Sequence, residues 1–207
     1  IAKQKKCEVT GISLSKNQIE YCKRKAKELN LDNQVKFELI DYREAKGKYD
    51  RIFSVGMFEH VGKKFYNTFF KSMNKLLKDD GIFLLHTIGV VDKPSPPNKF
   101  INKYIFTGGD CPSFSQIITP IEKTGLIVCD AETLIRHYDK TLESWLERFL
   151  DKKNEVKDLF DEKFVKMWEF YMASCAAAFR YKDLVVFQLQ IVKKFQSAHS
   201  TRDYIYS

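Results

Sequence analysis

The sequence predicts a doubly wound α/β domain, in which helices cover a mostly parallel sheet. In the first half of the chain, short apolar stretches alternate with stretches whose apolar residues recur at helical spacing. This alternation is typical of parallel strands joined by right-handed helical crossovers. The 207 residues are 44% apolar and 30% charged, which suits one globular core, so we expect residues 1–207 to form a single domain.

Six stretches are predicted to be strands because they are short, apolar and rich in β-branched or aromatic residues. The run YDRIFSV at 49–55 is apolar enough that we expect burial on both of its faces. The run GIFLLHTI at 81–88 is also strongly apolar. The predicted strands cover 7–13, 35–40, 49–55, 81–88, 126–134 and 184–192.

The stretches between the strands are predicted to be helices. Ser15 opens the first helix, and Gln18 stands three residues later as its capping-box partner. The helix at 64–77 begins its apolar face at Phe65 and is expected to stop at the Asp-Asp-Gly sequence of 79–81. The predicted helices cover 15–30, 64–77 and 113–124, with two further helices within 141–180.

Charge and cysteine content narrow the class of protein. The formal net charge is +8 and the pI is near 9.1, and such a basic chain would attract anionic partners such as lipid headgroups. The basic residues are scattered among acidic ones and form no nucleic-acid-binding module. Five widely spaced cysteines, without a CxxC pair, indicate reduced thiols in the cytosol and no metal site. There is no run of about 18 apolar residues that could span a membrane.

Polar residues follow the predicted strands where each strand ends. In a parallel sheet these carboxyl ends meet at one edge, where such folds bind their ligands. Residues 90–112 hold four of the five prolines and are expected to form a long excursion over that active-site face. The clusters at the strand ends are 13–18, Asp41-Tyr42-Arg43, 57–62, His86-Thr87-Ile88-Gly89 and His137-Tyr138-Asp139.

Each of these residues also has a plain structural interpretation, which the pattern leaves open. Glu59 could cap a helix or face solvent. A lone histidine such as His86, at the end of an apolar strand, is more often a packed core residue than a catalyst. Tyr138 could be an ordinary half-buried tyrosine. The small residues around Cys175 most simply indicate close helix packing, although they would also leave room for a tunnel.

Several enzyme classes are excluded because their motifs are missing. The sequence holds no GxxxxGK[ST] loop, no HExxH pair and no GxSxG elbow. Nucleoside triphosphate hydrolysis, zinc peptidase chemistry and α/β-hydrolase chemistry are therefore not expected.

Several motifs, taken together and in this order, resemble the cyclopropane-fatty-acyl-phospholipid synthase family. These are VGMFEHVG at 55–62, LLHTIG at 84–89, INKYIF at 101–106, HYDKTL at 137–142, ERF at 147–149 and ASCAAAFR at 173–180. The segment GISLSKNQ at 11–18 is similar to the related mycolic-acid cyclopropane synthases. The resemblance spans nearly the whole chain.

The resemblance implies a Rossmann-like class I methyltransferase fold, with helices inserted before the last strand. S-adenosylmethionine would be the co-substrate, and a bicarbonate ion would act as the base. The implied ligands of bicarbonate are Glu59, His86, Tyr138 and the backbone of Ile88. Cys175 matches a cysteine treated as an active-site residue, for which we favour a tunnel-lining role. The implied contacts of S-adenosylmethionine are Ser13, Leu14, Ser15, Lys16, Asn17, Gln18, Asp41, Tyr42 and Arg43.

The implied reaction adds a methylene to the cis double bond of an unsaturated phospholipid acyl chain. Methyl transfer to an alkene leaves a carbocation, which needs a dry pocket with aromatic faces. Closing the ring removes a proton, which bicarbonate would accept. His86 and Tyr138 could donate hydrogen bonds to that ion, while Glu59 could accept one from its hydroxyl.

The sequence departs from the family at its start. The family carries a first strand and a glycine-rich loop that would precede residue 1 and would lie between the strands at 7–13 and 49–55. That loop includes a cysteine that also touches bicarbonate, and the family's N-terminal lipid-associated domain would precede it. We therefore expect the 207-residue chain alone to bind S-adenosylmethionine weakly and to be inactive.

Two other functions stay open. One is a methyltransferase that stops before ring closure or that acts on a small amine. The other is a non-catalytic domain that binds a lipid surface, which the missing glycine loop would favour. In the leading interpretation the protein works from the cytoplasm as a peripheral protein at the inner membrane surface, on anionic phospholipid, and the full-length protein could form a homodimer.

Overall fold

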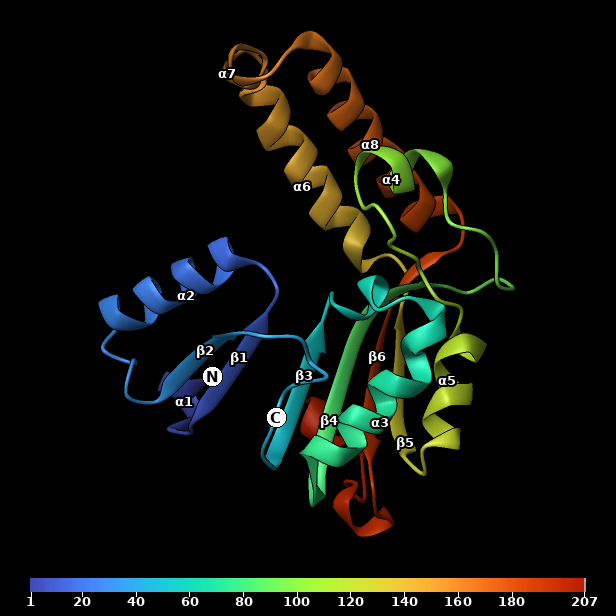
Figure 1. Cartoon of the computed structure of the whole chain (residues 1–207). Coiled ribbons are helices and arrows are strands. Elements are labelled where there is room, and N and C mark those ends of the chain that lie inside the picture. The colour runs from blue at the N-terminus through green and yellow to red at the C-terminus, as the bar shows by residue number, and fades with distance from the viewer. Residues whose placement is uncertain (207) are drawn as a thin grey trace. The chain divides into compact units, whose positions relative to one another are not determined.

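The computed structural model describes residues 1–206 and divides into two compact units (Figure 1). The first unit is Ile1–Lys48, and the second begins at Tyr49. Each unit has its own sheet, so each is described by itself. The expectation of one domain over residues 1–207 stays a prediction.

The first unit is a strand-helix-strand unit, which a short helix precedes in the sequence. Strands β1 and β2 pair in parallel, from Val9 opposite Val35 to Ser13 opposite Leu39. Helix α2 connects them and buries Ile19. The elements are α1 (Ala2–Lys5), β1 (Val9–Ser13), α2 (Lys16–Glu28) and β2 (Val35–Leu39).

The second unit contains a four-stranded sheet in the order β3-β4-β6-β5. Strand β4 runs parallel to β3, whereas β6 runs antiparallel to both of its neighbours, β4 and β5. Consequently β3, β4 and β5 have their carboxyl ends at one edge of the sheet. The strands are β3 (Tyr49–Val55), β4 (Leu77–Val90), β5 (Ile127–Leu134) and β6 (Leu184–Val192).

Helices cover one face of this sheet and extend beyond its edge. Helices α3 and α5 lie on one face, while α6, α7 and α8 rise from the edge where β4 and β5 end (Figure 1). Within the described residues, no helix is both long and apolar enough to cross a membrane. The helices are α3 (Tyr66–Leu76), α4 (Lys99–Tyr104), α5 (Phe114–Lys123), α6 (His137–Asp151), α7 (Lys153–Leu159) and α8 (Glu162–Tyr181), with 3-10 turns η1 (Phe58–His60), η2 (Lys63–Phe65), η3 (Phe195–Ser197) and η4 (Asp203–Ile205).

An aromatic core joins α3 to the sheet. The rings of Phe58, Phe69 and Phe70 are fully buried and lie within 5.1–5.5 Å of one another between centroids. Phe83 of β4 lies 6.1 Å from Phe69. This cluster holds η1 against α3, and it thereby fixes the segment that follows β3.

The predicted burial of 49–55 on both faces is wrong. Phe53 is 52% exposed and Val55 is 65% exposed. Both lie on β3, which stands at an edge of its sheet and pairs only with β4 in the part of the chain that the structure describes. An apolar run therefore did not distinguish a strand at the sheet edge from one in the centre.

The predicted helix boundaries are wrong at two other places. Helix α3 ends at Leu76, and the Asp-Asp-Gly sequence lies inside β4, at a register shift opposite Tyr49 and Arg51. The segment 141–180 holds three helices rather than two, and the first of them already begins at His137. The long last helix starts at its N-cap Asp161, whose side chain accepts a 2.6 Å bond from the backbone N–H of Phe164.

Candidate active site

The residues expected to bind S-adenosylmethionine lie at one edge of the first unit. Strands β1 and β2 are parallel, so the segments that follow Ser13 and Leu39 leave the sheet on the same side. The two segments are Ser13–Gln18 and Asp41–Arg43. The first unit therefore brings its predicted residues together.

A hydrogen-bonded turn links β1 to α2. The backbone N–H of Ser15 donates to the Ser13 hydroxyl at 3.1 Å, and this hydroxyl donates to Oε1 of Gln18 at 2.8 Å. The Ser15 hydroxyl accepts from the backbone N–H of Gln18 at 3.4 Å. One half of the predicted capping box is thus present, but the Gln18 side chain bonds to Ser13 instead of the Ser15 backbone. Ser13 thereby helps to fix the turn that would face the ligand.

Asp41 and Arg43 form a local ion pair after β2. Asp41 accepts from the backbone N–H and Nε of Arg43 and from its Nη2, at 2.9, 2.8 and 2.8 Å. The guanidinium holds the pKa of Asp41 below its usual range, so the carboxylate stays ionised at neutral pH. The Arg43 guanidinium also lies 5.9 Å from the centre of the Tyr42 ring. This rigid segment presents a carboxylate oxygen that could accept bonds from hydroxyl groups of a ligand.

In the second unit, Glu59 is held at the carboxyl end of β3. It lies in η1, is 9% exposed, and its Oε1 accepts a 2.7 Å hydrogen bond from the backbone N–H of Ile88. Its backbone carbonyl accepts from the N–H of Asp110 at 2.9 Å, so this bond links the end of the 90–112 excursion to Glu59. Within the described residues, Oε2 of Glu59 is buried and has no hydrogen-bond partner. A buried acceptor of this kind is suited to bind a proton-bearing ligand.

His86 lies on the same face of β4 as Ile88, two residues before it. Its Nδ1 is 3.0 Å from Nε2 of Gln188, which stands opposite it on β6. With the amide oriented as in the structure, Gln188 can only donate, so Nδ1 accepts and a neutral imidazole carries its proton on Nε2. His86 is therefore prepared to donate a hydrogen bond through Nε2.

Ile88, Tyr138 and Cys175 border one apolar cluster, which is formed by Leu142, Phe179 and Val186. The ring of Tyr138 lies 5.2 Å from that of Phe179. Burial raises the pKa of Tyr138, and the negative charge of Glu59 adds to that rise. The Tyr138 hydroxyl is thus protonated and can donate a hydrogen bond, and the charge of Glu59 influences it.

An ion pair fixes the helix that carries Tyr138. Asp139, which is 2% exposed, accepts bonds from Nε and Nη2 of Arg180 at 2.9 and 2.8 Å. Arg180 also pairs with Glu143. Because Arg180 belongs to α8, the start of α6 is tied to the end of α8. The pair positions Tyr138 relative to Cys175.

Cys175 is a protonated thiol in this environment. Burial raises its pKa to about 11. A thiol of this kind is a poor nucleophile at neutral pH, since the thiolate is the reactive form. It packs against the apolar cluster, and its expected tunnel-lining role stays a prediction.

Sequence reasoning missed two residues near Glu59. Tyr66 is 4% exposed, and Cys111 has a pKa raised to about 12 by burial and by the charges of Glu59 and Asp110. The signal for Tyr66 was its spacing, because Tyr66, Phe69, Phe70 and Met73 form the buried face of α3. The apolar face predicted from Phe65 is buried at Phe69, Met73 and Leu76, but Phe65 itself is 44% exposed.

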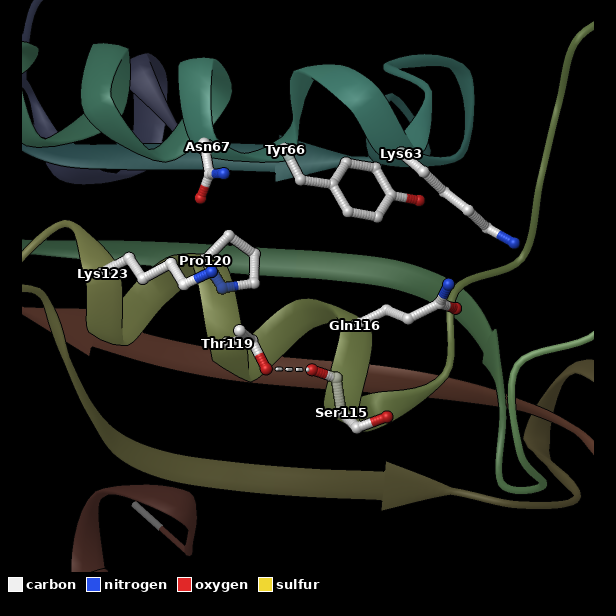
Figure 2. Close-up of a pocket in the computed structure, with 8 residues that line it drawn as sticks. All are labelled: Lys63, Tyr66, Asn67, Ser115, Gln116, Thr119, Pro120 and Lys123. Carbon is white, nitrogen blue, oxygen red and sulfur yellow. Dashed lines mark hydrogen bonds between the residues drawn. The ribbon is translucent and has the colours of Figure 1, made fainter.

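Two surface pockets lie near these residues. One, of about 360 Å³, lies between η2, α3 and α5, and Tyr66 and Lys63 are among its walls (Figure 2). The other, of about 510 Å³, is lined by Arg136, His137, Asp139 and Lys140 at the start of α6. Three exposed basic or imidazole side chains therefore flank Tyr138.

The strand arrangement defines the class of protein. A parallel strand pair with a helical crossover, and a sheet in which one antiparallel strand separates two parallel ones, form the class I S-adenosylmethionine-dependent methyltransferase fold. A model of the family described as "Mycolic acid cyclopropane synthetase" matches residues 1–189, and the chain belongs to this family.

Known proteins similar to this chain agree with that assignment. The "Cyclopropane-fatty-acyl-phospholipid synthase" of Escherichia coli (strain K12) is 40% identical over 181 residues, which are 87% of this chain and 46% of that protein. The "Tuberculostearic acid methyltransferase UfaA1" of Mycobacterium tuberculosis is 32% identical, over 90% of this chain and 45% of that protein. The structure of "mycolic acid cyclopropane synthase CmaA1 complexed with SAH and CTAB" matches with a TM-score of 0.82 and 29% identity, covering 89% of this chain and 69% of that one. The chain spans about half the length of these two curated relatives.

Proposed function

We propose that this chain carries catalytic residues of an enzyme that transfers a methylene from S-adenosylmethionine to cis double bonds of acyl chains in membrane phospholipids. The product would be a cyclopropane fatty acyl chain. Membership of the cyclopropane synthetase family supports this proposal. The observation that carries it is the buried Glu59 carboxylate, which Ile88 holds through Oε1 while Oε2 has no partner in the described part of the chain.

The residues fit bicarbonate, a small anion that carries one proton. Oε2 of Glu59 would accept from its hydroxyl, and Nε2 of His86 and the Tyr138 hydroxyl would donate to its other oxygens. When bound, bicarbonate would supply the base that takes the proton released at ring closure. We expected the backbone of Ile88 to touch the ion. Its N–H is used by Glu59 in this structure, so through that group Ile88 would hold Glu59 in place.

The apolar cluster beside these residues would exclude water from the acyl chain. Leu142, Phe179 and Val186 are at most 3% exposed, and Tyr138 adds an aromatic face. A carbocation beside such groups would be shielded from capture by water. The neutral thiol of Cys175 would line this space without competing as a nucleophile.

The substrate and the site of action belong to the same proposal. Arg136, His137 and Lys140 flank Tyr138 and would attract an anionic phosphate headgroup. The net charge of +8 favours a membrane surface with anionic lipid. We infer that the enzyme acts from the cytoplasm, bound peripherally to the inner membrane surface.

A second candidate is transfer of a methyl group without ring closure. The 32% identity to the tuberculostearic acid methyltransferase favours it. Both reactions would use the same S-adenosylmethionine contacts in the first unit, and they differ in where the proton leaves the acyl chain.

The test uses the full-length protein with methyl-labelled S-adenosylmethionine and vesicles of unsaturated phospholipid. The expected product carries one added CH2 per acyl chain and gives the high-field proton signals of a cyclopropane ring. Vinyl or methyl-branch signals would establish the second candidate instead. Binding to vesicles without binding of S-adenosylmethionine, measured by calorimetry, would replace both by the non-catalytic lipid-binding function.

A further inference from the structure

Tyr66 has a buried hydroxyl for which the described residues provide no hydrogen-bond partner. The side chain begins α3 and is 4% exposed. Leaving a buried hydroxyl unpaired is unfavourable, so such groups usually bind a ligand or water. We therefore expect a group that is not part of this chain to form a hydrogen bond with the hydroxyl.

Packing fixes the Tyr66 ring against the turn that carries Glu59. The Tyr66 ring stacks on Phe58 with a centroid distance of 4.3 Å and an interplanar angle of 24°. Phe58 is fully buried and directly precedes Glu59 in η1. The same turn therefore sets the positions of the Tyr66 ring and of the Glu59 carboxylate.

The Tyr66 hydroxyl is a hydrogen-bond donor in an environment to which the Glu59 charge contributes. Burial raises the pKa of Tyr66 above its usual range, and the charges of Asp110, Cys111 and Glu59 add to the rise. The hydroxyl thus keeps its proton at neutral pH. Glu59 offers the complementary group, because its Oε2 is a buried acceptor without a partner among residues 1–206.

Both atoms are buried and neither has a partner among residues 1–206, so one small group bound between them would satisfy both. Such a group accepts from the Tyr66 hydroxyl and donates to Glu59. Bicarbonate has both functions, since it combines a charged oxygen with a hydroxyl. Tyr66 and Lys63 are also among the walls of the pocket in Figure 2.

We propose that the Tyr66 hydroxyl donates a hydrogen bond to the bicarbonate ion whose own hydroxyl donates to Oε2 of Glu59. Tyr66 is then a further ligand of the base, besides the residues that the sequence indicated. The inference rests on the proposed function for the identity of the ion. It requires no change in protonation of Tyr66 and no bond other than hydrogen bonds.

The experiment measures binding without turnover. The thermal midpoint of the full-length protein is recorded against sodium bicarbonate, with sodium chloride at equal ionic strength and pH as reference. In the wild type the midpoint should rise with bicarbonate. Tyr66→Phe, which keeps the stacked ring, should need about tenfold more bicarbonate for the same rise, as expected for one lost hydrogen bond. Tyr206→Phe, at an 88% exposed tyrosine, should behave as the wild type.

Activity provides a second readout with a separate meaning. In Tyr66→Phe the bicarbonate concentration for half-maximal rate should rise about tenfold, while the KM for S-adenosylmethionine stays unchanged. A bicarbonate-dependent midpoint in a protein that makes no cyclopropane product would refute the proposed function and leave the Tyr66 inference standing.

Two results would overturn the inference. One is a wild-type midpoint that bicarbonate does not raise, which would leave water as the bridging group. The other is a Tyr66→Phe variant with an unchanged bicarbonate dependence. If Tyr66→Phe does not fold, Glu59→Gln tests the same bridge from the other side. Its amide can still accept from Ile88, and an undiminished bicarbonate effect would again reject the bridge.

Discussion

The backbone N–H of Ile88 donates a 2.7 Å hydrogen bond to Oε1 of Glu59, and this bond joins two segments that lie 29 residues apart. One segment is the turn after β3, and the other is the last part of β4. Because a strand amide is rigid, it fixes the carboxylate more firmly than a side chain could. Oε2 is thereby left as the oxygen that can act on a ligand.

Replacing Glu59 by glutamine should abolish most of the turnover while preserving the fold. The amide oxygen can take over the bond from Ile88, but an amide nitrogen cannot accept a proton or a hydrogen bond. Positioned acid–base groups contribute about 100-fold to 10,000-fold, so we expect a loss in that range. The measurement is labelled methylene incorporation into phospholipid. Glu147→Gln, at an exposed position of α6, is the matched control, and equal rates for both variants would remove Glu59 from the mechanism.

The strands were the most predictable part of the fold. The predicted ranges 49–55 and 184–192 agree with β3 and β6 at both ends, because short apolar runs bounded by polar residues mark strands clearly. What the sequence could not reveal was the partner of each strand. The exposure of Phe53 and Val55 follows from the edge position of β3, which depends on pairing rather than on composition.

The sequence indicated which residues belong to the candidate site, but it did not indicate the hydrogen bonds that orient them. The motif around Glu59 and the strand end at His86 indicated the residues, since both follow from the rule for strand ends and from the family resemblance. No local pattern indicated that Gln188, 102 residues away, would orient the His86 ring. Tyr66 was missed because it reads as one more apolar position of α3, and only its unpaired hydroxyl distinguishes it.

Ser13→Ala should weaken binding of S-adenosylmethionine. The Ser13 hydroxyl accepts from Ser15 and donates to Gln18, so its removal frees the turn that follows β1. Loss of this support should reduce the affinity roughly 10-fold. The affinity is measured by calorimetry on the full-length protein. Thr10→Ala, at an exposed position of the same strand, should bind as the wild type; an unchanged affinity in Ser13→Ala would exclude this turn from the cofactor site.

Charge reversal at Arg136 and Lys140 should reduce activity on anionic vesicles. Both side chains line the pocket beside Tyr138, where they would attract a phosphate headgroup. In the double variant Arg136→Glu/Lys140→Glu, the rate on anionic vesicles should fall several-fold at low salt. The difference in rate from the wild type should shrink at about 1 M salt, where the screening length is about 3 Å. A variant with Glu at Lys71 and Lys75 on α3 has the same net charge. If the two double variants lose activity equally, net charge rather than this pocket attracts the lipid.

Arg180→Ala should lower the thermal midpoint at neutral pH, and this difference should disappear in acid. The guanidinium holds the pKa of Asp139 below its usual value. A depressed carboxyl pKa stabilises the fold above the unfolded value of about 3.9, and the contribution is lost as pH falls through the folded value. The midpoints of both proteins are compared from pH 7 down to the acid limit of folding. Arg148→Ala, at an exposed site of α6, should show no such convergence, and a pH-independent gap for Arg180→Ala would mean that packing rather than charge stabilises this pair.

The half-buried thiol of Cys111 should make the fold less stable in alkali. Burial and the nearby negative charges raise its pKa to about 12, whereas an unfolded thiol titrates near about 8.5. Between these values the unfolded chain has lost the proton that the folded chain keeps, so each pH unit lowers the folding constant by up to about tenfold. Urea unfolding between pH 8 and pH 10.5 should show a shallower decline for Cys111→Ala than for the wild type, whatever its stability at pH 8. Cys7→Ala, at an exposed cysteine, should retain the wild-type slope. Identical slopes for all three proteins would mean that the Cys111 thiol reaches solvent and ionises in the native state, which would also place water next to Glu59.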